Sequence, residues 1–352
     1  MVRSFDRVHL IEAKSKDSAS ASIGDLNGDG FPDIVLARGR HIPLYNHILL
    51  NDGKGNFTVS NLSDTPDQTY AVALGDMDRD GRLDVVVSND SPDNKTVYRN
   101  QGKGRFRAMA TFGDPAWQAR YVALADFNKD GFPDIAVANR GMKSSVCWNN
   151  RKGAFPNCTR LASTKSPTII VAADFDGDGA IDLFVPHRDG TQSVVLWNDG
   201  KGGFTTSTKP FGTSAAYVRA AAAGDLNGDG QVDIVVGSEE GGVKYYLNTG
   251  KRTFSKPTSL CSTKSAVYSI VIADLNRDRM MDVIVGYKLA RGSIFYKTSS
   301  SNAYLEVPWN NGKGTVYGIA VADLDGDGWK DIVTARSDAP NAVWFSTPAK
   351  LA

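Results

Sequence analysis

The stretch Asp174-Phe-Asp-Gly-Asp-Gly-Ala-Ile-Asp182 places carboxylates at positions 1, 3, 5 and 9 of a loop and glycine at position 6. Glycine tolerates a positive φ, so the chain can turn there and bring the carboxylates together. Hard oxygen ligands suit Ca²⁺, which takes roughly 6–8 oxygens, and a backbone carbonyl at position 7 would add another. The flanking residues 168–173 and 183–185 form short apolar runs typical of β-strands. The stretch therefore predicts a calcium-binding loop between two strands.

The same loop occurs seven times, with first aspartates 48 to 51 residues apart. The loops span residues 25–33, 76–84, 126–134, 174–182, 225–233, 274–282 and 323–331. A repeat of about 50 residues containing several short strands is typical of a propeller blade. In the second repeat, for example, strands are expected at 70–75, 85–87, 96–99 and from 106 onward. We therefore predict an all-β fold, a single seven-bladed propeller of four-stranded antiparallel blades that spans residues 1–352.

The two ends of the chain predict how the ring closes. Residues 4–11 resemble the fourth strand of a blade, whereas the last repeat stops after a third strand at 342–346. We expect the N-terminal strand to complete the last blade, because closure removes exposed strand edges.

The predicted calcium ligands are the side chains at positions 1, 3, 5 and 9 of each loop. They are Asp25, Asn27, Asp29 and Asp33; Asp76, Asp78, Asp80 and Asp84; Asp126, Asn128, Asp130 and Asp134; Asp174, Asp176, Asp178 and Asp182; Asp225, Asn227, Asp229 and Asp233; Asp274, Asn276, Asp278 and Asp282; and Asp323, Asp325, Asp327 and Asp331. Six loops have glycine at position 6, but the loop at 274–282 carries Arg279 there. We expect up to seven Ca²⁺ ions, with this site the weakest.

The formal net charge of +1 conceals an uneven distribution of charge. The loops hold 24 of the 39 acidic residues, against 40 Lys and Arg in the chain. Seven Ca²⁺ ions would add 14 positive charges to this +1, so we expect weak, salt-sensitive attraction of anions. The basic residues are dispersed and no nucleic-acid-binding motif occurs, which argues against a nucleic-acid partner. No apolar run reaches the ~18 residues of a membrane span.

These loops resemble those of the FG-GAP/VCBS repeat family, whose members include integrin α-subunit propellers and a fungal calcium-dependent propeller lectin. The resemblance implies calcium loops on the lower face of the ring. It also implies ligand binding on the upper face or in the clefts between blades. The family contains adhesion, lectin and enzyme modules, so the resemblance implies a fold and a metal rather than one activity.

A ligand site is predicted from a shared register position near the central opening, six residues before each first aspartate. This position holds Ala19, Tyr70, Arg120, Thr168, Arg219, Tyr268 and Tyr317. Tyrosines and arginines are unusual at a packing position, and they can stack on sugar rings or bind carboxylates and sulfates. The predicted ligand-binding residues are Tyr70, Trp117, Arg120, Arg219, Tyr268 and Tyr317. The alternative is that the tyrosines fill the channel and the arginines are solvated.

The connections between the second and third strands add further charged residues to the same face. The basic or imidazole side chains are Arg38, Arg40, His41, Arg140, His187, Arg188, Lys288, Arg291 and Arg336, and the acidic exceptions are Asp90, Glu239 and Glu240. We predict a calcium-stabilised module that binds a glycan or a cell-surface protein through the upper face. Among glycans, an acidic one is favoured. The alternative is a polysaccharide lyase or a related carbohydrate-active enzyme that uses His41, Tyr45, His47 or His187 with arginines of the central funnel, although no catalytic motif occurs.

The cysteines and the N-terminus bear on location. Cys147 and Cys158 flank one predicted hairpin turn and can face each other across it, which leaves Cys261 unpaired. The alternative is three buried thiols. Residues 1–5 do not resemble a signal peptide. Because weak calcium sites fill where calcium is millimolar, we expect an extracellular or periplasmic protein whose export signal is missing from this sequence.

Overall fold

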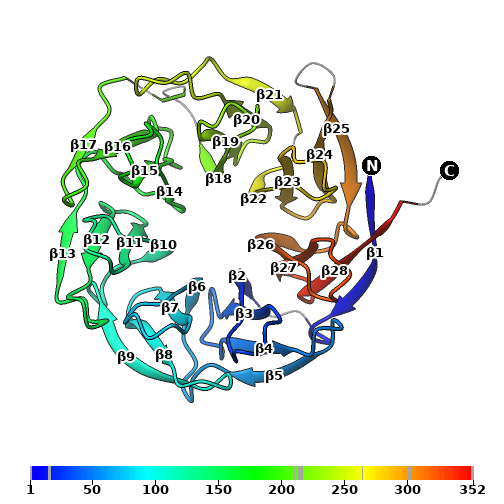
Figure 1. Ribbon diagram of the computed structural model, residues 1–352, viewed down its shortest axis with the longest axis horizontal. Coiled ribbons are helices and arrows are strands. Elements are labelled where there is room, and N and C mark those ends of the chain that lie inside the picture. The colour runs from blue at the N-terminus through cyan, green and yellow to red at the C-terminus, as the bar shows by residue number, and fades with distance from the viewer. Residues whose placement is uncertain are drawn as a thin grey trace.

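A computed structural model describes residues 2–14, 17–209, 211–212, 217–263, 265–299 and 303–349. These residues form seven antiparallel sheets of four strands arranged in a ring (Figure 1). In each of the first six sheets the chain runs from the innermost strand to the outermost. The seven-bladed all-β propeller is therefore confirmed.

The strands of the first three blades are as follows. Blade 1 has β2 (Ser18–Gly24), β3 (Asp33–Arg38), β4 (His47–Asn51) and β5 (Phe57–Asn61). Blade 2 has β6 (Thr69–Gly75), β7 (Asp84–Asn89), β8 (Lys95–Asn100) and β9 (Phe106–Phe112). Blade 3 has β10 (Ala119–Ala125), β11 (Asp134–Asn139), β12 (Ser145–Trp148) and β13 (Asn157–Arg160).

The remaining blades continue around the ring. Blade 4 has β14 (Val171–Ala173), β15 (Asp182–Val185), β16 (Val194–Asn198) and β17 (Phe204–Thr206). Blade 5 has β18 (Val218–Gly224), β19 (Asp233–Ser238), β20 (Val243–Tyr246) and β21 (Thr258–Cys261). Blade 6 has β22 (Val267–Ala273), β23 (Asp282–Tyr287), β24 (Gly292–Lys297) and β25 (Tyr304–Trp309). Blade 7 has β26 (Thr315–Ala322), β27 (Asp331–Ser337), β28 (Ala342–Pro348) and β1 (Arg3–Leu10).

The hydrophobic core lies between blades as well as within them. The second strands β3, β7 and β11 are buried along their whole length, because neighbouring blades cover both of their faces. One core cluster combines Ile34 and Leu49 of blade 1 with Val333 and Phe345 of blade 7. The first and last blades therefore share a hydrophobic core, as blades that follow one another in the sequence do.

The N-terminal strand closes the ring as predicted. β1 pairs antiparallel with β28, and the register places Val8 opposite Trp344 and Leu10 opposite Ala342. The guanidinium of Arg3 is buried and donates from Nε to Ser346 Oγ at 2.8 Å. The two ends of the described chain consequently lie side by side in one blade (Figure 1).

Asparagines at the ends of third strands join neighbouring blades. Asn100 Nδ2 donates to the carbonyl oxygen of Leu83 in its own blade at 3.0 Å and of Leu26 in the preceding blade at 2.9 Å. The same pair of bonds is made by Asn51, Asn149, Asn198 and Asn248. Each of these side chains therefore ties one blade to the next.

The cysteine alternatives are resolved in favour of a bond. Cys147 on β12 lies directly opposite Cys158 on β13, and the two form a disulfide. Cys261 is a free, partly buried thiol whose sulfur lies 3.7 Å from the Tyr287 hydroxyl.

Deleting residues 1–10 tests the closure. Without β1, the aromatic side chains of β28 lose their outer neighbouring strand. We therefore expect the free energy of unfolding to fall by about 3–5 kcal/mol, comparable to the effect of truncating a buried aromatic side chain. Thermal unfolding measures the difference, with Leu10→Ser as a control because Leu10 is 52% exposed. An unchanged melting temperature after the deletion would show that β1 does not close the ring.

Asn100→Asp tests the link between blades. The substitution removes both N–H donors and sets a carboxylate against two carbonyl oxygens, which should destabilise the fold by about 1–3 kcal/mol for each unsatisfied group. The matched control is Asn94→Asp, because that side chain is exposed in the β7–β8 connection. Denaturant unfolding of both variants should separate them, and equal stability would contradict a linking role for Asn100.

Candidate functional site

The seven acidic loops connect the first and second strands of every blade. In the fourth loop, the carboxylate of Asp174 at position 1 accepts hydrogen bonds from the backbone N–H of Gly177 and Gly179, both at 2.8 Å. Asp182 at position 9 is buried and accepts from Phe175 N at 3.0 Å and from Asn198 N at 2.7 Å. The bond from Phe175 to Asp182 fixes the loop, and the bond from Asn198 ties the loop to the third strand. The other loops repeat this arrangement around the ring.

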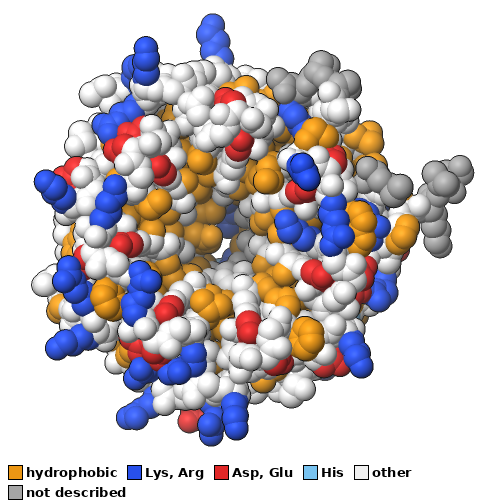
Figure 2. All heavy atoms as spheres, in the orientation of Figure 1, with side chains coloured by type: hydrophobic (Ala, Val, Ile, Leu, Met, Phe, Trp, Pro, Cys, Tyr) orange, Lys and Arg blue, Asp and Glu red, His pale blue; other side chains and the backbone are white. Residues whose placement is uncertain are grey.

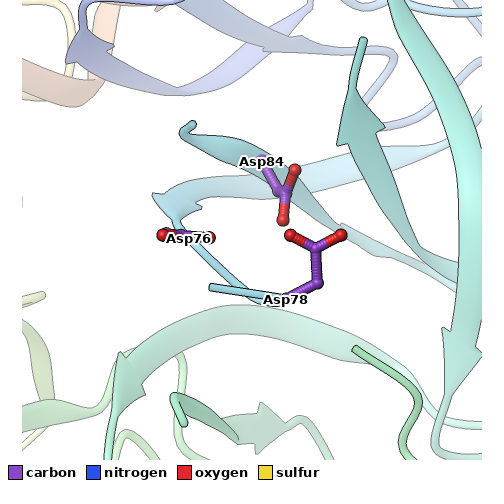
Figure 3. A group of neighbouring side chains, drawn as sticks. All are labelled: Asp76, Asp78 and Asp84. Atoms are coloured by element: carbon purple, nitrogen blue, oxygen red, sulfur yellow. The ribbon is translucent and has the colours of Figure 1, made fainter. Parts of the chain in front are cut away.

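Three of the loops bring aspartate oxygens close enough to hold a metal ion. The groups are Asp76, Asp78 and Asp84; Asp174, Asp176 and Asp182; and Asp323, Asp325 and Asp331, with the oxygens of each group within 4.8 Å of one another. Figure 3 shows the first group, in which Asp78 and Asp84 present their carboxylates to each other beside Asp76.

The chemistry of this first group fits a hard cation. Asp78 Oδ1 is buried without a hydrogen-bond partner, which is costly for a carboxylate unless a cation is near. Burial is the main cause that raises the pKa of Asp84 to about 6, with the neighbouring charges of Asp78 and Asp80 adding to it. A bound cation would relieve both penalties, so these residues fit the metal that the loop pattern predicts.

The other four loops have asparagine at position 3. In three of them the amide donates to the aspartate at position 5, from Asn27 to Asp29 at 2.8 Å in the first loop. In the sixth loop Arg279 adopts φ 68° and its N–H still donates to Asp274 at 2.9 Å. The loop therefore keeps its turn despite the missing glycine, and the weaker affinity expected for it stays a prediction.

A central cavity of about 330 Å³ opens on the face opposite the acidic loops. All seven residues of the predicted register position line it: Ala19, Tyr70, Arg120, Thr168, Arg219, Tyr268 and Tyr317. Arg40, His41, Arg140 and Arg188 add side chains from the ends of the second strands. Figure 2 shows the ring hollowed at its centre, with hydrophobic side chains at the edge of the hollow. Acidic side chains recur around this face, as expected for the face that carries the acidic loops.

A backbone irregularity explains why the register residues meet in this cavity. Six of the seven first strands have a register shift at this position, at residues 19, 70, 120, 219, 268 and 317. A bulge inserts one extra residue and re-aims its side chain. The residues at this position therefore line the central cavity, as the repeat spacing predicted. The bulge that directs them there could not be predicted from strand alternation alone.

Three of the cavity arginines are held by acidic partners. Arg120 lies 3.9 Å from the ring centroid of Tyr70 and 2.9 Å from Asp90 Oδ1. Glu239 accepts from Arg188 at 2.6 and 2.7 Å. This hydrogen bond is the main cause that lowers the pKa of Glu239, and it outweighs the opposing effect of burial.

Arg219 completes the second group. Its guanidinium stacks on Tyr268 at 3.7 Å from the ring centroid and lies 3.4 Å from Glu239 Oε1. Tyr268 in turn meets the edge of Tyr317 at 4.8 Å between centroids. These contacts fix the two tyrosines and the arginine relative to one another.

Arg40 and Arg140 differ from the other cavity arginines. Neither forms an ion pair within the part of the chain that the structure describes. Arg40 stacks 3.9 Å above the ring centroid of Tyr317, and its Nε is buried without a hydrogen-bond partner. Arg140 is exposed at the cavity mouth. Both belonged to the basic connections predicted from the sequence, but neither was placed among the ligand-binding residues.

Trp117 does not belong with the other predicted ligand-binding residues. Its side chain is 7% exposed and packs with Phe112 and Phe155 in the core of blades 2 and 3. Trp117 lies near Arg120 in the chain, but the turn before β10 points its indole into the core.

The four candidate catalytic side chains do not converge. His41 lines the cavity, with its ring 6.5 Å from that of Tyr70 between centroids. Burial, with the adjacent Arg40 charge as the next cause, lowers the pKa of His41. Tyr45 is 40% exposed on the β3–β4 connection and is not part of the cavity lining.

The other two histidines are occupied elsewhere. His47 lies beside the Arg38 guanidinium, and burial together with that charge lowers its pKa to about 4. His187 is buried, its Nε2 accepts from Lys165 N at 3.1 Å, and its Nδ1 lies 3.0 Å from Thr191 Oγ1. The arrangement needed for a lyase built on these four residues is therefore not assembled.

Comparison with known families agrees with the loop pattern. The FG-GAP-like repeat matches residues 25–87, 76–137, 126–185, 174–236 and 225–285. Together these segments cover more than half of the chain. The chain belongs to the FG-GAP repeat family. None of the curated proteins compared with the chain matches it in sequence.

Solved structures show the same propeller architecture. Crystal structures of BBS1N in complex with ARL6DN, soaked with lead or with mercury, align with 100% of this FG-GAP chain. The two alignments include 99% and 98% of the respective solved chains. The TM-scores are 0.68 and 0.66, and the sequence identity is 13% in each case. At that identity the likeness shows the fold alone. Within the described residues, no helix is sufficiently long and apolar to cross a membrane.

Proposed function

We propose that this FG-GAP propeller is a calcium-stabilised binding module that recognises an anionic group of its partner at the mouth of the central cavity. The observation that carries the proposal is the convergence of five arginines and four tyrosines in one cavity of about 330 Å³. No acidic side chain is part of the described lining, and the nearby carboxylates of Asp90 and Glu239 are already paired. The cavity therefore offers a surplus of positive charge.

The arginines have two different roles in this proposal. Arg120, Arg188 and Arg219 are held in place by ion pairs and define the walls. Arg40 and Arg140 have donor groups to spare, so they are the side chains that contact the incoming anion. Arginine binds carboxylate and phosphate-like groups with two parallel hydrogen bonds, which gives both energy and orientation. The stack of Arg40 on Tyr317 limits the orientations of the guanidinium before the ligand arrives.

A protein is the partner that the surroundings of the cavity support best. Ile42 and Leu289 lie on connections of the same face and are 56% and 60% exposed. Tyr45 and Tyr217 are also exposed there, at 40% and 38%. Protein interfaces are enriched in aromatic residues and arginine, and exposed apolar side chains beside the cavity would add contact area. The solved propeller with a similar fold was also crystallised with another protein, ARL6DN.

An acidic glycan is the second candidate. The cavity is small and concave, and tyrosine rings lie beside the arginines, an arrangement that suits stacking on a sugar that carries a uronate or sulfate group. The two candidates place the same kind of anion at the same arginines, so they differ in what surrounds that anion.

Substitution of the unpaired arginines tests the site. We expect Arg40→Ala or Arg140→Ala to weaken binding of an acidic ligand about 10–100-fold, because each loses a charge-assisted contact of about 1.5–3 kcal/mol. Titration calorimetry with uronate, sulfated and neutral oligosaccharides measures one class. Peptides selected from a random phage-displayed library measure the other.

The control is Arg107→Ala, which removes an exposed arginine from β9 on the outside of the ring. Arg120→Ala and Arg219→Ala probe the same walls, but each also releases an acidic partner. Acidic peptides that bind wild type and lose affinity in the cavity variants support the protein reading, and the same result with oligosaccharides supports the glycan reading. Equal binding of neutral and acidic ligands, or unchanged binding by the cavity variants, would contradict the proposed site.

Calcium and an oxidising location complete the proposal. Oxygen ligands without sulfur or nitrogen favour Ca²⁺ over transition metals, and the Cys147–Cys158 disulfide suits an extracellular or periplasmic protein. We propose that the module acts where both conditions are met.

Chelation tests the structural role of calcium. Carboxylates that converge within 4.8 Å repel one another, so EDTA should lower the melting temperature and Mg²⁺ should restore it poorly. Asp178→Ala should reduce the calcium-dependent rise in melting temperature more than Asp278→Ala, since the strained Arg279 weakens its own loop. A melting curve that is insensitive to exhaustive chelation would contradict structural calcium sites.

A further inference from the structure

Arginines accompany the aspartates at position 3 of the acidic loops. Three loops have aspartate there, and each of these aspartates contacts an arginine: Asp78 with Arg99, Asp176 with Arg252, and Asp325 with Arg7. The nitrogen–oxygen distance is 2.6 Å in each of the first two pairs. The aspartates are only 8–9% exposed, although their arginines are 42–52% exposed. Each guanidinium therefore covers a carboxylate that is almost buried.

The three arginines come from unrelated places in the fold. Arg99 lies on β8 of the same blade as its loop. Arg252 lies in the β20–β21 connection of blade 5 and reaches the loop of blade 4. Arg7 lies on β1, the strand that closes the ring. Since no repeated sequence position supplies them, the pairing is not a by-product of the repeat.

The four loops with asparagine at position 3 satisfy the same region differently. No described arginine or lysine side chain donates to these asparagines. In three of the loops the asparagine amide donates to the aspartate at position 5: Asn27 to Asp29, Asn227 to Asp229 and Asn276 to Asp278, at 2.8, 3.0 and 2.8 Å. In the third loop, which also has asparagine at position 3, Arg151 instead contacts Asp130 at position 5, at 3.1 Å. Among the described residues, an arginine therefore contacts position 3 only in the loops that have aspartate there.

We propose that Arg7, Arg99 and Arg252 are built-in counter-charges that stabilise the metal-free form of the three four-aspartate loops and lower their affinity for the metal. A loop of four ionised aspartates attracts the arginine more strongly before a divalent cation binds than after, because the cation halves the formal negative charge. By linkage, a group that favours the metal-free form weakens metal binding by the same factor. This inference does not depend on what the cavity binds.

The geometry allows arginine and metal to share one carboxylate. Asp78 contacts Arg99 through Oδ2, and its Oδ1 is buried without a hydrogen-bond partner near Asp76 and Asp84. The arginine therefore does not have to leave when a cation binds. The arginine therefore changes the equilibrium between the metal-free and the metal-bound loop, and it does not block the entry of the cation. For Arg7 the same balance involves ring closure, because its backbone is part of β1.

A triple substitution tests the proposal. In Arg7→Gln, Arg99→Gln, Arg252→Gln, we expect the melting temperature in EDTA to fall by about 2–6 °C, as three partly exposed ion pairs would give. The fall should be clearly smaller in saturating Ca²⁺. Calorimetric titration of the chelator-treated protein with CaCl₂ should show about two- to five-fold tighter binding at the affected sites. The matched control is Arg105→Gln, Arg107→Gln, Arg160→Gln, which makes the same change of net charge at exposed arginines without an ion pair among the described residues.

The outcomes separate the possible roles. A larger destabilisation in EDTA than in Ca²⁺, absent from the control, supports the counter-charge. Equal losses in both conditions would reduce the arginines to ordinary surface pairs. Weaker calcium binding by the triple variant would show that the arginines position the carboxylates for the metal, which overturns the proposal. Unchanged melting temperature and affinity would also overturn it. None of these results changes what is expected of the cavity variants.

Discussion

The hydrogen bonds of the buried aspartate at position 9 are the constraint on which the rest of the propeller depends. In every blade this carboxylate accepts from the backbone N–H at position 2 and from the N–H at the end of the third strand, as Asp233 does from Leu226 at 2.8 Å and from Asn248 at 2.7 Å. It therefore fixes the loop, the second strand and the third strand with one side chain. The asparagine amide at the same strand end then reaches the carbonyl at position 2 of the preceding loop. Loop geometry and blade spacing are thus coupled.

The burial of an aspartate in every loop has an electrostatic cost, because a buried carboxylate is less favourable in its ionised form. Burial raises the pKa of Asp134 and Asp331 to about 7, and nearby carboxylates add to the shift. A raised pKa means that ionisation in the folded state is unfavourable, so in the metal-free protein these groups favour folding less as the pH rises from about 4 to about 7. A divalent cation, an arginine or an amide donor beside the loop each offsets part of this cost. Among the described residues, some loops have the arginine and others the amide donor.

The sequence was sufficient for the architecture because the decisive features repeat. The loop spacing predicted seven blades, and the unmatched strands at the two ends predicted closure by β1. Counting from each aspartate also predicted which residues meet in the cavity. It could not predict that Arg120 is held by Asp90, or that Arg40 stacks on Tyr317, because these contacts join different blades and depend on side-chain conformations. Trp117 was misplaced for the same reason, since its environment is set by the core of two blades and not by its neighbours in the chain.

The differences among the repeats separate structural from functional positions. Position 9 of the loop is aspartate in all seven repeats, and the residue at the end of the third strand is asparagine in five of them. Invariance of this kind is expected where the same backbone groups must be satisfied in each blade. The position six residues before each first aspartate has the opposite behaviour. It holds alanine, tyrosine, arginine or threonine in different blades, although all seven residues line the same cavity. A packing role shared by seven equivalent sites would favour similar side chains. Because the fold delivers each residue to one central space, variation at that position changes the composition of the cavity without disturbing the blades, and the cavity is therefore where this propeller can acquire a specific partner.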